Sequence, residues 1–236
     1  MKSPLVLLSA ASVLTVGLAI AQDKAPDAEP MKADAIEERY GHLEKGKSGF
    51  KETWFNPETD WTKFDKIYFW EAEFQYRDVG PARRTRSTMM NTRQREFGIL
   101  EKDQRAFEDA VSEAFTKEME KGKRFSIVDE IAPGTLILRG GALDIVSNVP
   151  PEFNTGMNEI YMTTFGEVTL LLELIDAESG DVVAVVAERR AIGTPNRNLD
   201  SFTMPTNSVT VTSAVRRWAT SAAGKLRKGL DDAIKG

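Results

Sequence analysis

The chain of 236 residues contains no cysteine. This absence excludes disulfides, a thiolate nucleophile and cysteine ligands for a metal. It also excludes the lipid-modified cysteine that follows many bacterial export signals. An exported form of the chain is therefore expected to be free in the periplasm unless protein contacts hold it.

Histidine is almost absent, since His42 is the only one. It stands beside a glycine in a polar stretch, where a lone imidazole is most often simply solvated. The sequence also has no G-x-S-x-G nucleophile elbow and no H-E-x-x-H zinc helix. The common catalytic triads would lack parts, and we predict no metal and no cofactor.

Long apolar runs are missing except at the N-terminus. There, an apolar run over residues 5–18 follows Lys2 and leads into small residues. This order is typical of a secretory signal peptide cleaved between Ala21 and Gln22. As a helix the run would extend about 21 Å, short of the ~30 Å hydrocarbon core, so an uncleaved anchor is the weaker alternative. We expect residues 1–21 to be removed and the protein to be periplasmic.

Basic residues are outnumbered, with 31 Lys and Arg against 36 Asp and Glu. Removal of the leader takes away Lys2 alone and changes the formal net charge from −5 to −6. This acidic balance argues against nucleic acid as the main partner. The polar residues 22–35 contain two prolines and are typical of a flexible tether. Residues 36–236 are expected to form a single α/β domain.

The clearest structural pattern is a hairpin over residues 166–191. Val168, Leu170, Leu172 and Leu174 alternate onto one strand face, and Gly180 lies in the following turn. The run "VVAVVA" after the turn is apolar on both faces, as an interior strand would be.

Five further elements complete the predicted fold. β-branched and aromatic residues predict a strand over 66–74, and apolar residues at helical spacing predict helices over 100–121 and 209–234. "RFSIVD" and "GTLILRGGALDIVSNV" predict two more strands. In the second of these, Gly140 and Gly141 indicate a bulge or a close backbone approach. We therefore predict an α/β (α+β) two-layer sandwich, a mixed sheet of about five strands with two main helices on one face.

A phosphate-loop pattern occurs over residues 41–48, "GHLEKGKS", which satisfies G-x-x-x-x-G-K-[ST]. Phosphate binding by such a loop needs a strand before it and a helix after it. The flanking segments "ADAIEERY" and "GFKETWFNP" predict neither, and Glu44 would place a carboxylate among the phosphates. The pattern therefore does not predict a nucleotide site.

Over most of its length from Tyr40 onward, the chain resembles the bacterial envelope proteins of the family called domain of unknown function 3313. The matching pieces are "RYGHLEKGKSGF", "NPETDWTKFDKIYFWEAEF", "KRFSIVDEIAPGTLILRGGALDIV", "VTLLLELIDAESGDVVAVVAERRA" and "RRWA". Many members are lipoproteins, whereas this chain lacks the required cysteine. The element order is also similar to that of TolB amino-terminal domains and of the curli secretion lipoprotein. These resemblances imply a role in envelope assembly or in contacts with other proteins. A similar fold alone does not establish that role for this chain.

Two groups of carboxylates are candidates for chemistry. Glu71 and Glu73 alternate onto the same strand face, where a general acid and base could be placed. We favour the simpler interpretation that they line a solvated edge or pair with arginines of the following loop. Asp176, Glu178 and Asp181 crowd the hairpin turn and would attract a hard cation, but they miss the calcium-loop spacing. We expect a hydrated turn there.

The most individual feature is an arginine cluster between the first strand and the first helix. Besides Arg77, its members are Arg83, Arg84, Arg86, Arg93 and Arg95. Most such runs of charge are only solvated, and we expect a solvated loop. The alternative is an anionic envelope partner, at roughly 1 kcal/mol for each residue that reaches an anionic surface.

Aromatic residues concentrate just before and within the first predicted strand: Trp54, Phe55, Trp61, Phe64 and Trp70. They indicate a cover packed across the sheet edge, with a binding groove as the alternative.

The leading hypothesis is a non-enzymatic periplasmic protein that binds another envelope component. The alternative is a carboxylate-based hydrolase of envelope glycans or lipids that uses Glu71 and Glu73. A third possibility is a homo-oligomer assembled through the tether and the last helix.

Overall fold

The computed structural model describes residues 40–79, 96–150, 160–193 and 203–235. The elements in chain order are β1 (Glu44–Lys45), β2 (Glu52–Phe55), the 3-10 helix η1 (Trp61–Lys63), β3 (Lys66–Tyr76), α2 (Glu101–Met119), β4 (Ser126–Val128), β5 (Thr135–Ser147), β6 (Tyr161–Met162), β7 (Thr164–Asp176), β8 (Val182–Gly193), β9 (Met204–Pro205) and α3 (Ser208–Ala233). This mixture of helices and strands is the α+β class that the sequence predicts.

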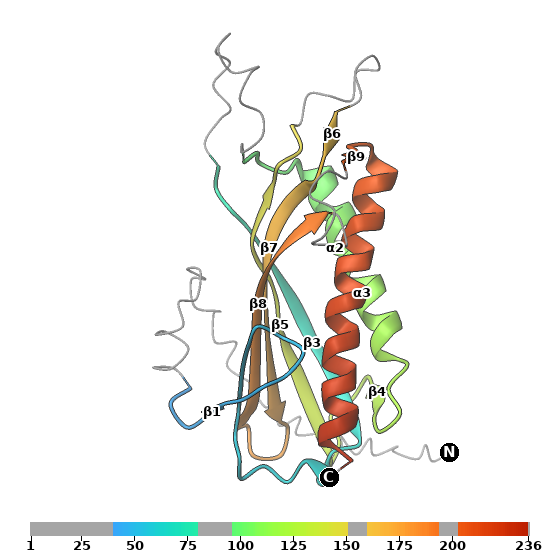
Figure 1. Cartoon of the computed structure of the whole chain (residues 1–236). Coiled ribbons are helices and arrows are strands. Elements are labelled where there is room, and N and C mark those ends of the chain that lie inside the picture. Colours follow the sequence, from blue (N-terminus) through green and yellow to red (C-terminus); the bar gives the residue numbers. More distant parts are fainter. Residues whose placement is uncertain (1–39, 80–95, 151–159, 194–202, 236) are drawn as a thin grey trace, which may run out of the picture.

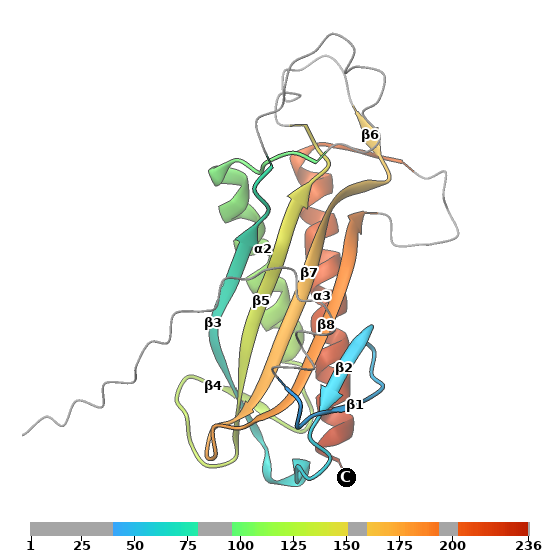
Figure 2. The same cartoon turned by 90° about the vertical axis from the view of Figure 1, so that its left-hand side faces the viewer.

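The main sheet has seven strands in the order β1-β2-β8-β7-β5-β3-β4, and Figure 2 shows its central strands side by side. Strand β3 runs parallel to both β4 and β5, whereas the other neighbours are antiparallel. The sheet is therefore mixed, as predicted, and the apolar run of β8 lies in an interior strand. Strands β6 and β9 form a separate two-stranded sheet.

The prediction of about five strands was too low, because β1 and β2 were not recognised. They lie in the aromatic segment that we interpreted as a cover. Both are short, and β2 pairs with β8 through Glu52↔Ala187 and Phe55↔Ala184. Pairing of so short a segment depends on its partner strand rather than on its own pattern.

Both helices cover the same face of the sheet (Figure 1). Their bounds match the predicted helices to within two residues at each end. The buried residues of α2 are Phe107, Ala110, Val111, Ala114, Glu118 and Met119, and those of α3 include Val215, Trp218, Ala222, Leu226 and Leu230. The apolar side of α3 is thus used within the chain, against α2 and the sheet.

Aromatic rings connect the edge of the sheet to both helices. Phe69 on β3 contacts Phe115 on α2 edge to face, with 6.3 Å between ring centroids. Phe107 meets Phe74 at 6.2 Å and stacks on Trp218 of α3 at 6.4 Å. Such pairs add to the burial of the rings and fix how the layers are aligned.

The other face of the sheet has a smaller apolar cluster of its own. Tyr40, Leu43 and Trp54 are buried there against Val185 of β8. Trp54 is 7% exposed but lies within strand β2, so it packs as part of the sheet and not as a cover across its edge, and Trp70 is 45% exposed.

Gly140 and Gly141 lie where β5 approaches both of its neighbours. Gly140 has a φ of 139°, and a Cβ on it would lie 2.1 Å from the Leu171 carbonyl oxygen. A Cβ on Gly141 would lie 1.8 Å from the Glu73 carbonyl oxygen. The predicted close backbone approach is confirmed, because only glycine fits both contacts.

Among the helices in the described ranges, none has the length and apolarity needed to cross a membrane. The leader 1–21, its cleavage point and the tether 22–35 lie outside those ranges.

Candidate functional site: an apolar cavity at one end of the sheet

An apolar cavity of about 220 Å³ lies between the helix layer and the sheet. It is at the end of the molecule where α2 and α3 begin and where β5 and β8 end (Figure 1). Its walls come from both helices, these strand ends, the start of β7 and the segments beside them. The large apolar residues of the lining are Ile99, Leu100, Phe107, Ile145, Val146, Val149, Phe165, Ile192, Val211 and Val215.

Small residues form part of the cavity wall. Gly98, Ala106 and Ala110 line it on the α2 side, and Gly166 lines it on β7. Ala106 is exposed and Ala110 is buried, so the cavity reaches from the surface into the core. An apolar cavity of about 150 Å³ already stays dry and takes up benzene.

Several polar groups in the cavity wall are engaged with one another. The Ser147 hydroxyl accepts a hydrogen bond from the Val149 N–H at 3.0 Å. The Ser147 backbone exchanges two hydrogen bonds with Phe97, at 2.7 and 3.3 Å, and the Asn148 N–H donates to the Phe165 carbonyl at 2.8 Å. Among the described residues of the lining, only Asp103 has an ionisable side chain. The wall is therefore suited to dispersion contacts with an apolar group.

The two helix starts at this end differ in how they are capped. Asn207 caps α3 by accepting a hydrogen bond from the Thr210 N–H at 2.9 Å. The N-cap of α2 is Leu100, which makes no side-chain cap, while Glu101 and Asp103 lie in its first turn. These carboxylates are favourable next to the positive end of the helix dipole. Glu101 pairs with Arg105, so Asp103 supplies the acidic group of the rim.

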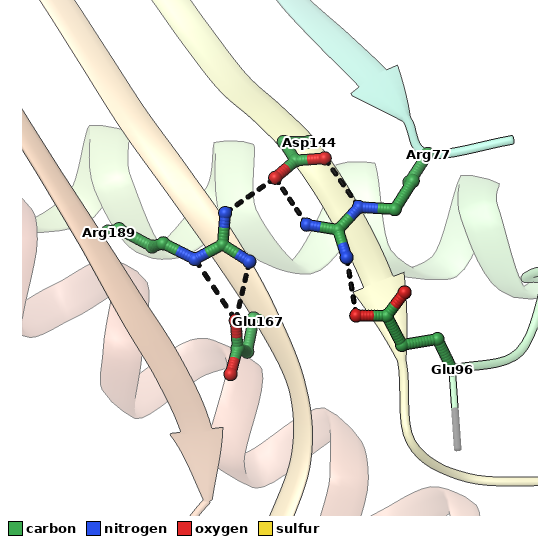
Figure 3. A network of polar contacts seen from close by, with 5 residues as sticks. All are labelled: Arg77, Glu96, Asp144, Glu167 and Arg189. Atoms are coloured by element: carbon green, nitrogen blue, oxygen red, sulfur yellow. Dashed lines mark hydrogen bonds and ion pairs between the residues drawn. The ribbon is translucent and has the colours of Figure 1, made fainter. Parts of the chain in front are cut away.

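A network of charged residues lies at the same end of the sheet on the side of the strands away from the cavity (Figure 3). Arg77 donates from Nε and Nη2 to Asp144 at 2.6 and 2.5 Å, and its Nη1 pairs with Glu96. Arg189 donates to Asp144 at 2.6 Å and to Glu167 at 2.6 and 3.0 Å. The network ties together β5, β7, β8 and the end of β3.

Asp144 is the centre of this network and has a φ of 52°. It lies at the irregularity in the pairing of β5 with β7 between Leu143 and Val146. The hydrogen bond from Arg77 lowers the pKa of Asp144, burial opposes this effect, and the hydrogen bond from Arg189 adds to it. The carboxylate is thus held ionised.

The predicted arginine cluster is represented in the described residues by Arg77 alone. Its guanidinium is used by Asp144 and Glu96, and these carboxylates raise its pKa. The interpretation that Arg77 binds an anionic partner was wrong, because its guanidinium already pairs with two carboxylates of the chain. The other members lie outside the described residues: Arg83, Arg84, Arg86, Arg93 and Arg95.

The carboxylate pair on the first strand does not lie in the cavity. Glu71 and Glu73 are both exposed on β3, where the pairing with β5 is irregular between Phe69 and Ala72. His42 is also exposed, and its Nε2 lies 3.2 Å from the Val182 carbonyl oxygen.

The hairpin turn differs from the hydrated turn that we expected. Asp176 is buried, with Lys63 Nζ 2.6 Å from its Oδ2, and it also accepts a hydrogen bond from the Glu178 N–H. Burial raises the pKa of Asp176, but the Lys63 hydrogen bond and the backbone bond outweigh burial and lower it. Among the described residues, no cluster of three His, Asp or Glu side chains has metal-binding geometry. Asp176 therefore connects η1 to the hairpin.

The phosphate-loop pattern forms no phosphate cradle. It includes the short strand β1, and β2 follows it where a phosphate loop would need a helix. The Ser48 hydroxyl lies 2.6 Å from that of Thr53 and accepts a hydrogen bond from the Phe50 N–H. The serine therefore stabilises the turn into β2.

The cavity itself was missed by the sequence analysis. Its lining comes from several segments far apart in the chain, and each residue is of an ordinary core type. The small residues at helical spacing, Ala106 and Ala110, were the only available signal, and they are equally typical of close helix packing.

No family model matches the chain, so the resemblance to domain of unknown function 3313 is not confirmed, and no curated protein matches it. Among solved structures, a Xanthomonas campestris protein of family DUF330 is 12% identical, with a TM-score of 0.36 over 76% of this chain and 90% of its own. A PelC dodecamer from Paraburkholderia phytofirmans is 11% identical, with a TM-score of 0.31 over 78% and 96%. A neuraminyllactose-binding hemagglutinin homolog from Helicobacter pylori is 13% identical, with a TM-score of 0.32 over 73% and 84%.

Proposed function

We propose that this protein is an exported, non-enzymatic binding module of the bacterial cell envelope, and that its apolar cavity holds an apolar group of its ligand or partner. The observation that carries the proposal is the cavity of about 220 Å³ between α2, α3 and the sheet. A concave, preformed and mostly apolar site is the usual form of a binding site.

The chemistry of the wall supports binding rather than catalysis. Asp103 is the one ionisable side chain among the described lining residues, and the Ser147 hydroxyl is engaged by its own loop. A general acid and base pair would need two titratable groups on one substrate. Glu71 and Glu73, the residues on which a hydrolase would depend, are exposed on β3.

The surroundings of the cavity keep its walls in place. The Arg77–Asp144–Arg189 network holds the strand ends together from the other face of the sheet. The stack of Phe107 on Trp218 fixes α2 against α3 just below the cavity. A preorganised wall lowers the entropic cost of binding.

The proposed location depends on the sequence. The apolar run at 5–18 and the small residues before Gln22 support export. The arginines at 83, 84, 86, 93 and 95 support an additional contact with an anionic envelope component.

The experiment is site-specific photo-crosslinking in living bacteria that express the full chain. A photoreactive amino acid replaces Ala106, which lines the cavity, or Ala191, an exposed neighbour of the lining residue Ile192 on β8. We expect a crosslinked envelope component from position 106 and not from position 191. Equal products at both positions, or none at 106, would contradict the proposal.

A further inference from the structure

We propose that the cavity takes the hydrocarbon chain of a single-tailed amphiphile whose head group carries no net negative charge. This inference rests on the proposed function, because it names the ligand of the same cavity. It follows from the shape of the cavity, the pairing of its polar groups and the charge of its rim.

The cavity is elongated along the helices. On α3 the lining runs from Ser208 to Val215, a rise of about 10 Å. On α2 it runs from Leu100 to Ala110, about 15 Å. A volume of about 220 Å³ spread over this length is narrow. It is below the roughly 300–1,000 Å³ of sites that enclose a whole ligand, so it fits one chain with the head group outside.

The polar groups of the wall favour a hydrocarbon over a peptide. An inserted peptide segment would bring N–H and C=O groups that need partners. Several backbone groups near the cavity are already paired: Phe97 with Ser147 in both directions, Asn148 with Phe165, and Thr206 with Ile160. A methylene chain makes no such demand, and each buried methylene strengthens binding.

The rim selects the head group. Asp103 lines the cavity at the start of α2, whereas Glu101 in the same turn pairs with Arg105. The Asp103 carboxylate repels a fatty-acid carboxylate and attracts a cationic or zwitterionic head. The formal charge of −5 on the whole chain acts in the same direction.

The test titrates the purified full chain with monomeric alkyltrimethylammonium ions, from hexyl to tetradecyl, by isothermal calorimetry. Affinity should rise about fourfold for each added methylene and then level off when the cavity is full. Decanoate should bind more weakly than decyltrimethylammonium. Asp103→Asn should reduce this preference and keep the dependence on chain length.

Two cavity-filling variants and one control locate the site. Ala106→Trp and Thr212→Trp place an indole in the cavity from opposite helices, and each should weaken decyl binding roughly tenfold or more by displacing methylene groups. Ala191→Trp makes the same change outside the lining and should bind like wild type. Circular dichroism verifies that each variant is folded. If Ala106→Trp does not fold, Thr212→Trp alone tests whether the cavity is the binding site.

Several results would overturn the inference. These are an affinity that does not change with chain length, wild-type affinity in both cavity-filling variants, binding only to phosphatidylcholine vesicles, or concentration-dependent self-association through the cavity. If crosslinking from position 106 succeeds while no alkyl chain binds, the proposed function stands and this inference fails. If both experiments fail, both proposals fall.

Discussion

Arg77 donates two hydrogen bonds to the Asp144 carboxylate, from Nε to Oδ1 at 2.6 Å and from Nη2 to Oδ2 at 2.5 Å. This bidentate pair connects the end of β3 to β5 just where the pairing of β5 with β7 is irregular. The Asp144 side chain is only 13% exposed and also accepts a hydrogen bond from Arg189. The strand ends behind the cavity are thus held by ion pairs around one shielded carboxylate.

Replacing Asp144 by Asn should destabilise the protein by about 1–3 kcal/mol at neutral pH, because two charge-assisted contacts are lost. Asn tolerates the positive φ of this position, so the change isolates the charge. The pKa of Asp144 is lowered in the folded state, so its contribution is present above the unfolded pKa of about 3.9 and is lost as the pH falls through the folded pKa. Urea unfolding of both proteins at neutral and acidic pH should show the difference shrinking with acid. A difference that is constant with pH would contradict this account.

Asp176 gives a second test at the opposite end of the sheet. Asp176→Asn should cost about 1–2 kcal/mol, because the Lys63 ion pair and a hydrogen bond to a buried carboxylate are weakened. Asp65→Asn is the matched control, since Asp65 pairs with Lys66 but is 65% exposed and should contribute little. Hydrogen exchange should show faster exchange in the hairpin turn for the first variant only. Equal losses in both variants would refute the special role of Asp176.

The contacts of two glycines predict that the same change to alanine lowers stability at one position and raises it at the other. Gly141→Ala should destabilise by about 3 kcal/mol or more, because the new methyl group would meet the Glu73 carbonyl of the adjacent strand. Gly229→Ala in α3 meets nothing within 4 Å and should stabilise by about 0.5–1 kcal/mol. Thermal unfolding measures both, and a tolerated Gly141→Ala would show that β3 and β5 are not held in this register.

The leader predicts a processed protein that begins at Gln22. Ala21→Leu should block cleavage and accumulate the longer precursor, because the protease requires a small residue there. Ala25→Leu, just beyond the predicted cleavage point, should be processed normally. Mass spectrometry of fractionated cells distinguishes the two forms, and an intact wild-type chain in the cytoplasm would contradict export.

The arginine cluster predicts binding to anionic surfaces. Changing Arg83, Arg84 and Arg86 to Ser should weaken binding to anionic vesicles by up to about 3 kcal/mol at low salt, with a smaller effect at physiological salt. The control changes three exposed arginines of the helices to Ser: Arg105, Arg216 and Arg217. Vesicle sedimentation compares the two triple variants, and identical binding would remove the proposed role of the cluster.

Local pattern was sufficient for the longer elements. The stripe of Phe107, Val111 and Ala114 predicted α2, and the alternation of Leu170, Leu172 and Leu174 predicted β7, because each element buries one regular face. The paired glycines predicted a close approach before their neighbours were known. Strand β2 was missed because its four residues pair with β8, whose position the sequence does not reveal.

What the sequence determined by itself is therefore the periodic part of the molecule: the α+β class, the two helices on one face and the interior place of β8. These follow from hydrophobic periodicity, which is a property of neighbouring residues. Only the tertiary structure decided the seven-stranded order, the pairing of Arg77 with Asp144 and the cavity beside Phe107. Each of these depends on groups brought together from distant segments, and the residue types alone do not say which partners will meet.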